Sequence, residues 1–284
     1  MSGTPGLIDK NGGGEMENSE IFSRTLLEDK VAIITGGGTG IGKEIAHQLG
    51  KAGAKLVLSG RREHVLKQTE EEFVSKGFEV LSVPTDIREV DQVENLVAET
   101  VNRFGKVDIL INNAGGQFPK KVEELTKNGW DAVIRTNLNG TFYVTQAVGK
   151  QMIKQGTGGA ITNMLVSFLH RGAPGIAHSV AARNGVYGLM KNLALEWAKY
   201  NIRINSIGAG LFITEGMQEE MAAADPHFIE NTINAVPSKR VGNLEELGWL
   251  ATFLSSKASG YITGENIIID GGNSLGHGIT FFPY

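Results

Sequence analysis

The stretch VAIITGGGTGIGKEIAHQLGKAG, from Val31 to Gly53, decides the fold. A strand-length apolar run leads into a glycine-rich turn, TGGGTGIG, from Thr35 to Gly42, and an amphipathic segment with helical spacing follows. Glycines let the backbone turn tightly and approach a pyrophosphate, and a helix that starts there offers free N–H groups and a positive dipole end. Three adjacent glycines also fit a plain flexible turn, but their position between a strand and a helix favours phosphate binding.

The same alternation of strand-like and helical segments continues along the chain. Short β-branched runs such as KLVLS (55–59), VLSVPTD (80–86) and VDILINN (107–113) are separated by helical segments of ten or more residues. Strands that are apolar on both faces predict an α/β fold, a doubly wound parallel sheet with helices on both faces. We expect a single domain over residues 27–284, and residues 1–26, rich in glycine and polar or acidic residues, to form a disordered tail.

Composition limits the classes of partner. The chain has 284 residues, a formal net charge of -4 and no cysteine. The charge gives no reason to expect a nucleic acid or an anionic membrane as partner, and no apolar run is long enough to span a bilayer. Without cysteine there is no disulfide or thiolate chemistry, and the six histidines lack metal-ligand spacing. We therefore expect a cytoplasmic protein with a small-molecule substrate and no metal.

The second predicted strand ends in LSGRR, residues 58–62, where a dinucleotide-binding fold meets the adenosine ribose. A carboxylate at Gly60 would bind a free 2′-hydroxyl and repel a 2′-phosphate. Arg61 and Arg62 instead offer charge-assisted contacts to a phosphate, which favours NADP(H) over NAD(H). In the alternative interpretation, both arginines are only the solvated start of a surface helix.

Several motifs together resemble the short-chain dehydrogenase/reductase family from Leu27 to Ser274: TGGGTGIG, Asp86-Ile87, NNAG (112–115), Asn137 in TNLNGTF, RIN (203–205) and IIIDGG. The resemblance implies the Rossmann arrangement and a homodimer or homotetramer. It also implies a set of cofactor-binding residues. These are Gly36, Thr39, Gly40, Ile41, Gly42, Arg61, Arg62, Asp86, Ile87, Asn113, Ala114, Gly115 and Thr214.

The chain departs from the family pattern at the reacting end. The family's catalytic Ser, Tyr and Lys fall at Val166, Ser179 and Arg183. Valine donates no hydrogen bond, a serine hydroxyl is a poor proton donor, and arginine keeps a positive charge but does not give up a proton. We therefore expect carbonyl reduction through tyrosine to be impaired or absent.

A Tyr-x-x-x-Lys pair, Tyr187 and Lys191, recurs eight residues later, and its spacing places both side chains on one helix face. Eight residues correspond to roughly 12 Å of helical rise, so simple displacement of the motif is improbable. In the alternative interpretation, Tyr187 is a packed aromatic residue and Lys191 a solvated lysine. GGQF (115–118) and HSVAARNGVYGLMKNLALEWA (178–198) resemble peroxisomal trans-2-enoyl-CoA reductases, in which the matching tyrosine is regarded as the proton donor.

These patterns predict an oxidoreductase that transfers hydride from NADPH to an α,β-unsaturated acyl thioester. A carbonyl, 3-ketoacyl-CoA or 2,4-dienoyl-CoA reductase stays open as an alternative, as does a catalytically silent nucleotide-binding protein. An excursion from Thr214 to about Val236, with Met217 and Met221, is expected to supply an apolar wall for an acyl chain. The candidate catalytic residues are Tyr187, Lys191, Asn137, Arg183 and Ser179.

Overall fold

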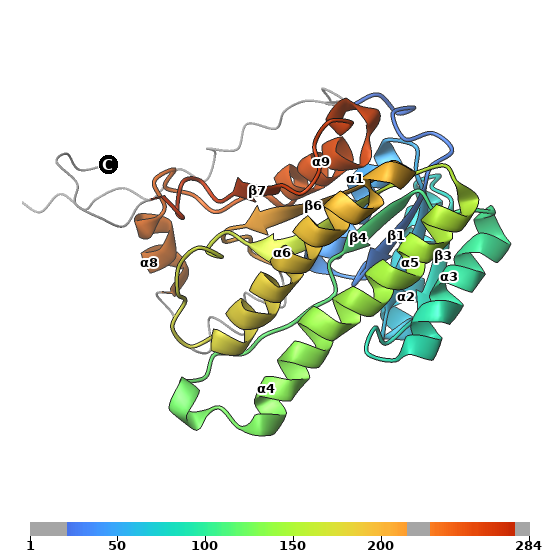
Figure 1. The fold of residues 1–284 in the computed structure, drawn as a ribbon. Coiled ribbons are helices and arrows are strands. Elements are labelled where there is room, and N and C mark those ends of the chain that lie inside the picture. Colours follow the sequence, from blue (N-terminus) through green and yellow to red (C-terminus); the bar gives the residue numbers. More distant parts are fainter. Residues whose placement is uncertain (1–21, 215–227, 276–284) are drawn as a thin grey trace, which may run out of the picture.

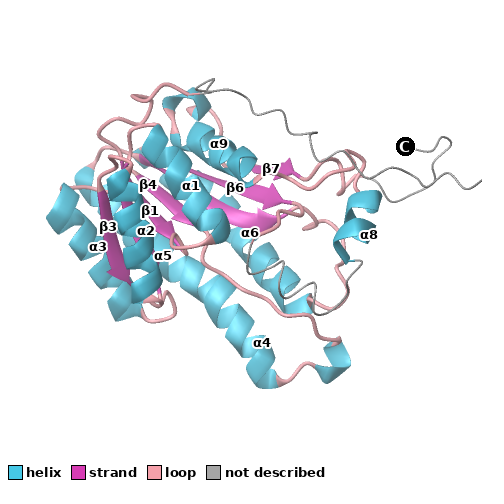
Figure 2. Cartoon of the chain, turned by 180° about the vertical axis from the view of Figure 1, so that it is seen from behind, coloured by secondary structure: helices cyan, strands magenta, loops and turns pink. Residues whose placement is uncertain are grey.

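The apolar runs form one parallel sheet in the computed structural model, which describes residues 22–214 and 228–275 (Figure 1). In these ranges the sheet has seven strands in the order β3-β2-β1-β4-β5-β6-β7, and the strand arrows point the same way (Figure 2). The predicted doubly wound sheet is confirmed. The strands are β1 Val31–Thr35, β2 Lys55–Gly60, β3 Val80–Pro84, β4 Ile109–Asn112, β5 Gly159–Val166, β6 Ile202–Ala209 and β7 Asn266–Ile269.

Helices connect the strands and cover both faces of the sheet (Figures 1 and 2). Two irregular segments are η1, a 3₁₀ turn at Val122–Glu124, and η2, a π-helical turn at Arg135–Gly140, of which η2 contributes to the site. The helices are α1 Gly40–Lys51, α2 Glu63–Ser75, α3 Val90–Phe104, α4 Lys127–Ile134, α5 Thr141–Gln155, α6 Ala177–Trp197, α8 Phe228–Ala235 and α9 Leu244–Ser255.

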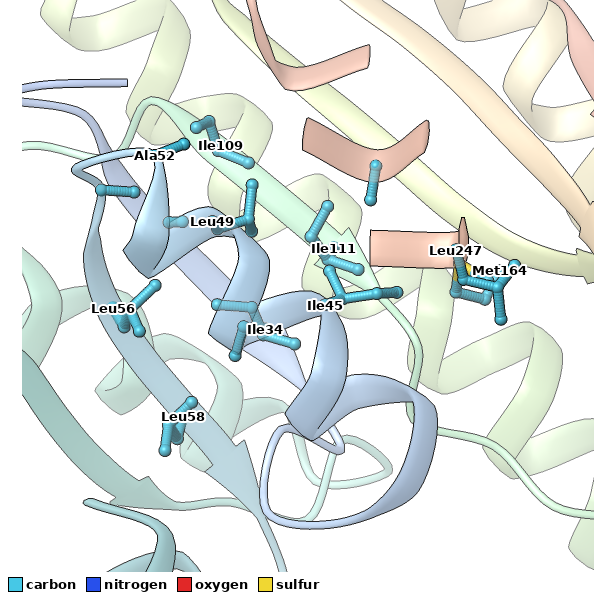
Figure 3. Packing of buried hydrophobic residues seen from close by; sticks show 14 of the residues in the cluster. Ile34, Ile45, Leu49, Ala52, Leu56, Leu58, Ile109, Ile111, Met164 and Leu247 are labelled. Atoms are coloured by element: carbon cyan, nitrogen blue, oxygen red, sulfur yellow. The ribbon is translucent and has the colours of Figure 1, made fainter. Parts of the chain in front are cut away.

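Successive residues of each strand point to opposite faces, so every strand contributes to two cores. Ala32 and Ile34 of β1 pack against α1, α2 and α9, and Figure 3 shows this cluster around Ile34, with Leu247 reaching it from α9. Val31 and Ile33 pack on the other face, against α3, α5 and α6. Burial on both faces explains why these strands read as continuous apolar runs.

The site is positioned by the point at which the strand order reverses. The chain moves outward from β1 to β2 and β3, then crosses to β4 on the other side of β1. The loops after β1 and β4 therefore leave the sheet in different directions, and ligands of such folds bind in the crevice between them. TGGGTGIG follows β1 and NNAGGQF begins at the end of β4, so both motifs line this crevice.

Some expectations fall on residues outside the described ranges. Most of the predicted N-terminal tail lies outside these ranges. Met217 and Met221, from the segment expected to form an apolar wall for an acyl chain, also lie outside them, whereas α8 of that segment is described. In the described part of the chain, no helix has the length and apolar character needed to cross a membrane. No group of three potential metal ligands occurs in these ranges either.

Candidate active site

The glycine-rich turn is shaped by contacts that exclude side chains. Gly36 and Gly40 have φ angles of +67° and +52°, in the left-handed region. A Cβ on Gly42 would lie 2.2 Å from the Gly36 carbonyl oxygen. The Asn113 side chain donates to the carbonyls of Thr35 and Gly36 at 3.1 and 3.3 Å, which ties the turn to the end of β4. The cradle at the start of α1 therefore fits a pyrophosphate.

A hydroxyl fixes the spacing between β1 and β4. Thr35 Oγ1 accepts the backbone N–H groups of Asn113 and Ala114, each at 3.0 Å, and donates to the Ile111 carbonyl at 3.3 Å. These bonds satisfy backbone groups where the two loops diverge. A buried side chain consequently ties the end of β1 to the start of the loop after β4.

A pocket of about 210 Å³ extends from the turn toward the ends of β2 and β3. It brings together eight of the predicted cofactor residues: Gly36, Thr39, Arg61, Arg62, Asp86, Ile87, Ala114 and Gly115. Gly40, Ile41, Gly42, Asn113 and Thr214 do not line it. Of these, Asn113 supports the turn, and Thr214 lies 3.0 Å from where a Cβ of Gly40 would stand. Gly38 of the TGGGTGIG turn and Gly60, the position where the sequence offers no carboxylate, also line the pocket. Sequence reasoning missed Val65, Leu66, Thr85, Arg88 and Thr136, which complete the lining.

Positive charge is in excess at the adenosine end of this pocket. Arg61 and Arg62 are exposed, and their guanidinium groups form no hydrogen bond or ion pair with another described residue. Arg88 is occupied by Asp86: Arg88 Nε donates to the two carboxylate oxygens at 2.8 and 3.1 Å, and Nη2 donates as well. The hydrogen bonds from Arg88 hold the pKa of Asp86 below its usual value, so the carboxylate stays charged and neutralised. Two arginines remain to meet an anion.

At the other end of the crevice, Ser179, Arg183 and Asn137 come together around Gly115. A Cβ on Gly115 would lie 3.1 Å from Asn137 Oδ1 and 3.9 Å from Arg183 Nη2. Arg183 Nε donates to Ser179 Oγ at 3.2 Å, and Nη1 donates to the Met164 carbonyl at 2.9 Å.

The charge of Arg183 has no counter-ion among the described residues. Solvent touches part of its side chain, but the guanidinium is densely surrounded, and this desolvation lowers its pKa to about 10. Arg183 is therefore still cationic at neutral pH. The structure brings this cation, the hydroxyl of Ser179 and the amide of Asn137 to one place. The Ser179 hydroxyl donates to Gln117, whereas Arg183 Nη2 donates to no described residue and is a donor that an oxygen-bearing ligand could use.

Asn137 acts on the backbone of the loop that follows NNAG. Its side chain accepts from the Gly116 N–H at 3.0 Å and donates to the Gly116 carbonyl at 2.9 Å. It lies in the π-helical turn between α4 and α5, and such turns are frequent at functional sites. From this position the buried side-chain amide of Asn137 points away from the helix and hydrogen-bonds to Gly116 in the loop after β4.

The next two residues of the loop are held by α6. Ser179 Oγ donates to Gln117 Oε1 at 2.6 Å, and the Phe118 ring lies edge-on to His178 at 4.7 Å between centroids. His178 is buried, and its Nδ1 accepts the Ser179 N–H at 2.9 Å. Sequence reasoning gave Gln117 no role. A single polar side chain between glycines and an aromatic residue was the only local signal.

Tyr187 and Lys191 contact each other, and Tyr187 also contacts the loop after β5. The Lys191 ammonium stands 4.3 Å from the centroid of the Tyr187 ring, and His170 lies edge-on to that ring at 6.1 Å. Tyr187 is half-buried and packs against the cluster formed by Leu165, Leu169 and Val186. It does not line the cofactor pocket, but Val166, which stands where the family has its serine, packs against the same cluster.

Comparisons with known proteins agree with this geometry. A family model described as Enoyl-(Acyl carrier protein) reductase matches residues 36–274. A probable 2,4-dienoyl-CoA reductase [(2E)-enoyl-CoA-producing] of Bacillus subtilis (strain 168) is 38% identical over 250 residues, covering 88% of this chain and 98% of the relative. Gluconate 5-dehydrogenase of Gluconobacter oxydans (strain 621H) is 35% identical over 257 residues, covering 90% and 98%.

A solved structure shares the fold closely. Gluconate 5-dehydrogenase from Burkholderia cenocepacia J2315, in complex with NADP and tartrate, superposes with a TM-score of 0.84 at 34% identity. The match covers 89% of this chain and 98% of that one.

Proposed function

Because the chain belongs to the short-chain dehydrogenase/reductase family of oxidoreductases, we propose that it is an NADPH-dependent reductase of an α,β-unsaturated acyl thioester, of the trans-2-enoyl-CoA type. The observation that carries the proposal is the pairing of Ser179 with Arg183 at the positions of the family's tyrosine and lysine. A ketone reductase needs a proton donor there, and neither side chain is one.

The cofactor proposal rests on charge and shape at the adenosine pocket. Gly60 leaves no carboxylate to repel a 2′-phosphate, and Arg61 and Arg62 are available to bind one. The turn from Gly36 to Gly42 fits the pyrophosphate, because side chains are excluded from it. These residues would hold NADPH, which supplies a hydride when it is bound.

In the reduction of an enoyl thioester, the negative charge develops farther from the hydride-accepting carbon than it does in the reduction of a ketone. Hydride goes to the β-carbon, and the developing negative charge appears on the thioester oxygen. The donor for that oxygen must therefore be displaced from the hydride acceptor, and stabilisation is worth most where charge develops. In our proposal Tyr187, which packs against the same cluster as Val166, gives a proton to the α-carbon, and Asn137 and Arg183 hold the surrounding groups in place.

A 2,4-dienoyl-CoA is a second candidate substrate, since the Bacillus subtilis relative carries that name. Hydride addition to a dienoyl thioester also delivers charge to the thioester oxygen, so the same site chemistry serves both. Gluconate 5-dehydrogenases among the relatives motivate a ketone substrate as the opposing case.

One assay compares these substrates. Purified protein is given NADPH with a trans-2-enoyl-CoA, a 2,4-dienoyl-CoA or a 3-ketoacyl-CoA, and the loss of NADPH absorbance is followed. We expect turnover of an unsaturated thioester and none of the ketone. Turnover of the ketone alone would refute the proposal, and NADPH binding without any turnover would support a silent nucleotide-binding protein.

A further inference from the structure

A chain of hydrogen bonds with a fixed direction runs from Arg183 through Ser179 to Gln117. A guanidinium only donates, so Ser179 Oγ is the acceptor in its 3.2 Å contact with Arg183 Nε. The Ser179 hydroxyl proton is then directed to Gln117 Oε1, 2.6 Å away. Arg183, the first member of this series of hydrogen bonds, thereby determines that the oxygen of the Gln117 amide faces α6.

The free end of that amide is a pair of donors. Because Oε1 accepts from Ser179, the Nε2 hydrogens of Gln117 point away from α6. Nε2 donates to no other residue in the part of the chain that the structure describes. Gln117 is exposed, whereas Ser179 is buried, so the donors are presented at the open side of the crevice by a buried support.

The residues on either side of Gln117 are also held. Asn137 clamps both backbone groups of Gly116, and His178 packs edge-on against Phe118. Three consecutive loop residues are thus each fixed by a different side chain. A donor held in this way needs little reorganisation when charge appears on a bound oxygen, which is the condition for effective oxyanion stabilisation.

The Gln117 side chain lies beside the position of the family's tyrosine, because Ser179 stands at that position and donates to its amide oxygen. Gly115, two residues before Gln117, lines both the cofactor pocket and the small cavity beside Arg183. Gln117 therefore joins the loop that borders the cofactor pocket to the part of α6 on which the family carries its phenol.

We propose that the side-chain amide of Gln117 donates a hydrogen bond to the thioester carbonyl oxygen of the substrate, and that Ser179 and Arg183 are positioning residues which orient it. This inference rests on the proposed function, since its ligand is an unsaturated acyl thioester.

No bond to Gln117 forms or breaks in this role. The hydride of NADPH adds to the β-carbon, and NADPH becomes NADP⁺. The electron pair of the C=C bond moves to form the double bond of an enolate, whose oxygen takes the negative charge and accepts from Gln117 Nε2. The α-carbon then takes a proton from Tyr187, which regains one from solvent, and the carbonyl is restored.

The first test removes the donors and keeps the support. In Gln117→Glu the side chain still accepts from Ser179 but has no N–H, and in Gln117→Leu both functions are lost. We expect kcat to fall about 100-fold in both variants, with NADPH affinity unchanged. Gln68→Glu, an exposed change of the same kind on α2, is the matched control and keeps wild-type kcat. Wild-type rates in both Gln117 variants would overturn the inference.

A double-mutant cycle tests the positioning role of Ser179. Ser179→Ala releases Gln117 and should lower kcat, but it should have no further effect when Gln117 is already leucine. Coupled residues give such non-additive effects, whereas independent ones add. Additive losses in the double variant would overturn the proposed orientation of Gln117 by Ser179.

A spectroscopic test separates this inference from the proposed function. An enoyl-CoA labelled with carbon-13 at its carbonyl is bound together with NADP⁺, which cannot deliver hydride. Infrared difference spectra should show a lowered carbonyl stretching frequency in the wild type, restored in Gln117→Leu. Binding with no lowering, or a lowering that survives in Gln117→Leu, overturns the inference even if the wild type turns over the substrate. Failure to bind any thioester overturns both proposals.

Discussion

Arg183 carries a positive charge, and no carboxylate among the described residues pairs with it. Its described partners are a hydroxyl and a backbone carbonyl, and desolvation alone accounts for its lowered pKa of about 10. A base whose pKa is lower in the folded state destabilises the fold while it is charged, and this penalty is relieved only as pH rises through that pKa. At neutral pH the residue is therefore retained at a cost to stability.

We accordingly expect Arg183→Met to keep the free energy of unfolding or to raise it by about 1 kcal/mol, while kcat falls. Chemical unfolding and turnover of the same preparation measure both. Arg203→Met is the matched control: Arg203 donates to the carbonyls of Leu254, Ser256 and Ile262, so its loss should destabilise the fold. A loss of several kcal/mol in Arg183→Met would mean that its hydrogen bonds hold the fold together.

The phenol of Tyr187 can be tested without disturbing its packing. Tyr187→Phe keeps the ring packed against Leu165, Leu169 and Val186 and under the Lys191 ammonium, and it removes only the hydroxyl. If that hydroxyl protonates the α-carbon, kcat should fall about 100-fold or more with little change in KM. Tyr200→Phe, at the end of the same helical segment, should have no effect. An unchanged rate in Tyr187→Phe would mean that water or another group supplies the proton.

At the scale of elements, α6 carries four residues of the reacting end, and Asn137 of η2 and Gln117 of the loop after β4 complete it. Ser179, Arg183, Tyr187 and Lys191 follow each other at four-residue spacing, and the first two and the last two are each in contact. The helix thus presents a hydrogen-bonding pair toward Gly115 and an aromatic–cation pair toward the loop after β5. A small rotation of α6 would disturb both pairs together.

A second element contact joins the helix of the glycine-rich turn to its neighbour. Glu72 on α2 is 2.6 Å from Lys43 Nζ on α1 and 2.8 Å from the Nζ of Lys76, the residue that follows α2. Hydrogen bonds from Lys43 and then Lys76 lower the pKa of Glu72 to about 2. A carboxylate whose folded pKa is depressed stabilises the fold above its ordinary pKa of 4.5, and this contribution is lost as pH falls toward 2.

Glu72→Gln should therefore cost about 0.5 kcal/mol of unfolding free energy at neutral pH, a small value because the pair is partly exposed and screened. The difference from wild type should shrink between pH 4.5 and pH 2, the two pKa limits given above. Unfolding by urea across this range measures it. Glu71→Gln, exposed and without an ion pair among the described residues, should show no such dependence. A constant difference at all pH values would contradict the ion-pair explanation.

At the scale of the whole molecule, the cofactor pocket draws on loops after β1, β2, β3 and β4 and on η2. A ligand that bridges these segments stabilises the folded state by mass action, by about 2.7 kcal/mol at a concentration 100 times its Kd. We expect NADPH to raise the melting temperature by several degrees, and more than NADH at equal concentration.

Arg61→Ala should remove most of that difference between NADPH and NADH, because it removes a phosphate contact and leaves the pyrophosphate cradle intact. Arg103→Ala, at the far end of α3, should leave it in place. Differential scanning fluorimetry with NADPH and with NADH measures the two shifts in melting temperature. Equal shifts for the two cofactors, unaffected by Arg61→Ala, would contradict the NADP(H) assignment.

The sequence was sufficient for the fold and the family, both of which are confirmed. Strand-length apolar runs and the turn from Thr35 to Gly42 are local patterns, and local patterns can be read without coordinates. The missed residues depend on distant segments: Thr136 reaches the pocket from a π-helical turn, and Gln117 meets Ser179 across 62 positions of sequence. The roles assigned to the site residues remain predictions.

The packing of α9 against α1 has a consequence for synthesis of the protein. Gly248 of α9 lies so close to α1 that a Cβ there would stand 2.4 Å from Gln48 Cγ, and Leu247 and Leu254 complete the cluster that covers β1. A ribosome makes the strands of the nucleotide-binding half long before it makes α9. Until α9 emerges, Ile45 and Leu49 keep an apolar flank that α9 does not yet cover, and such transiently exposed surface is where a nascent chain is prone to aggregate.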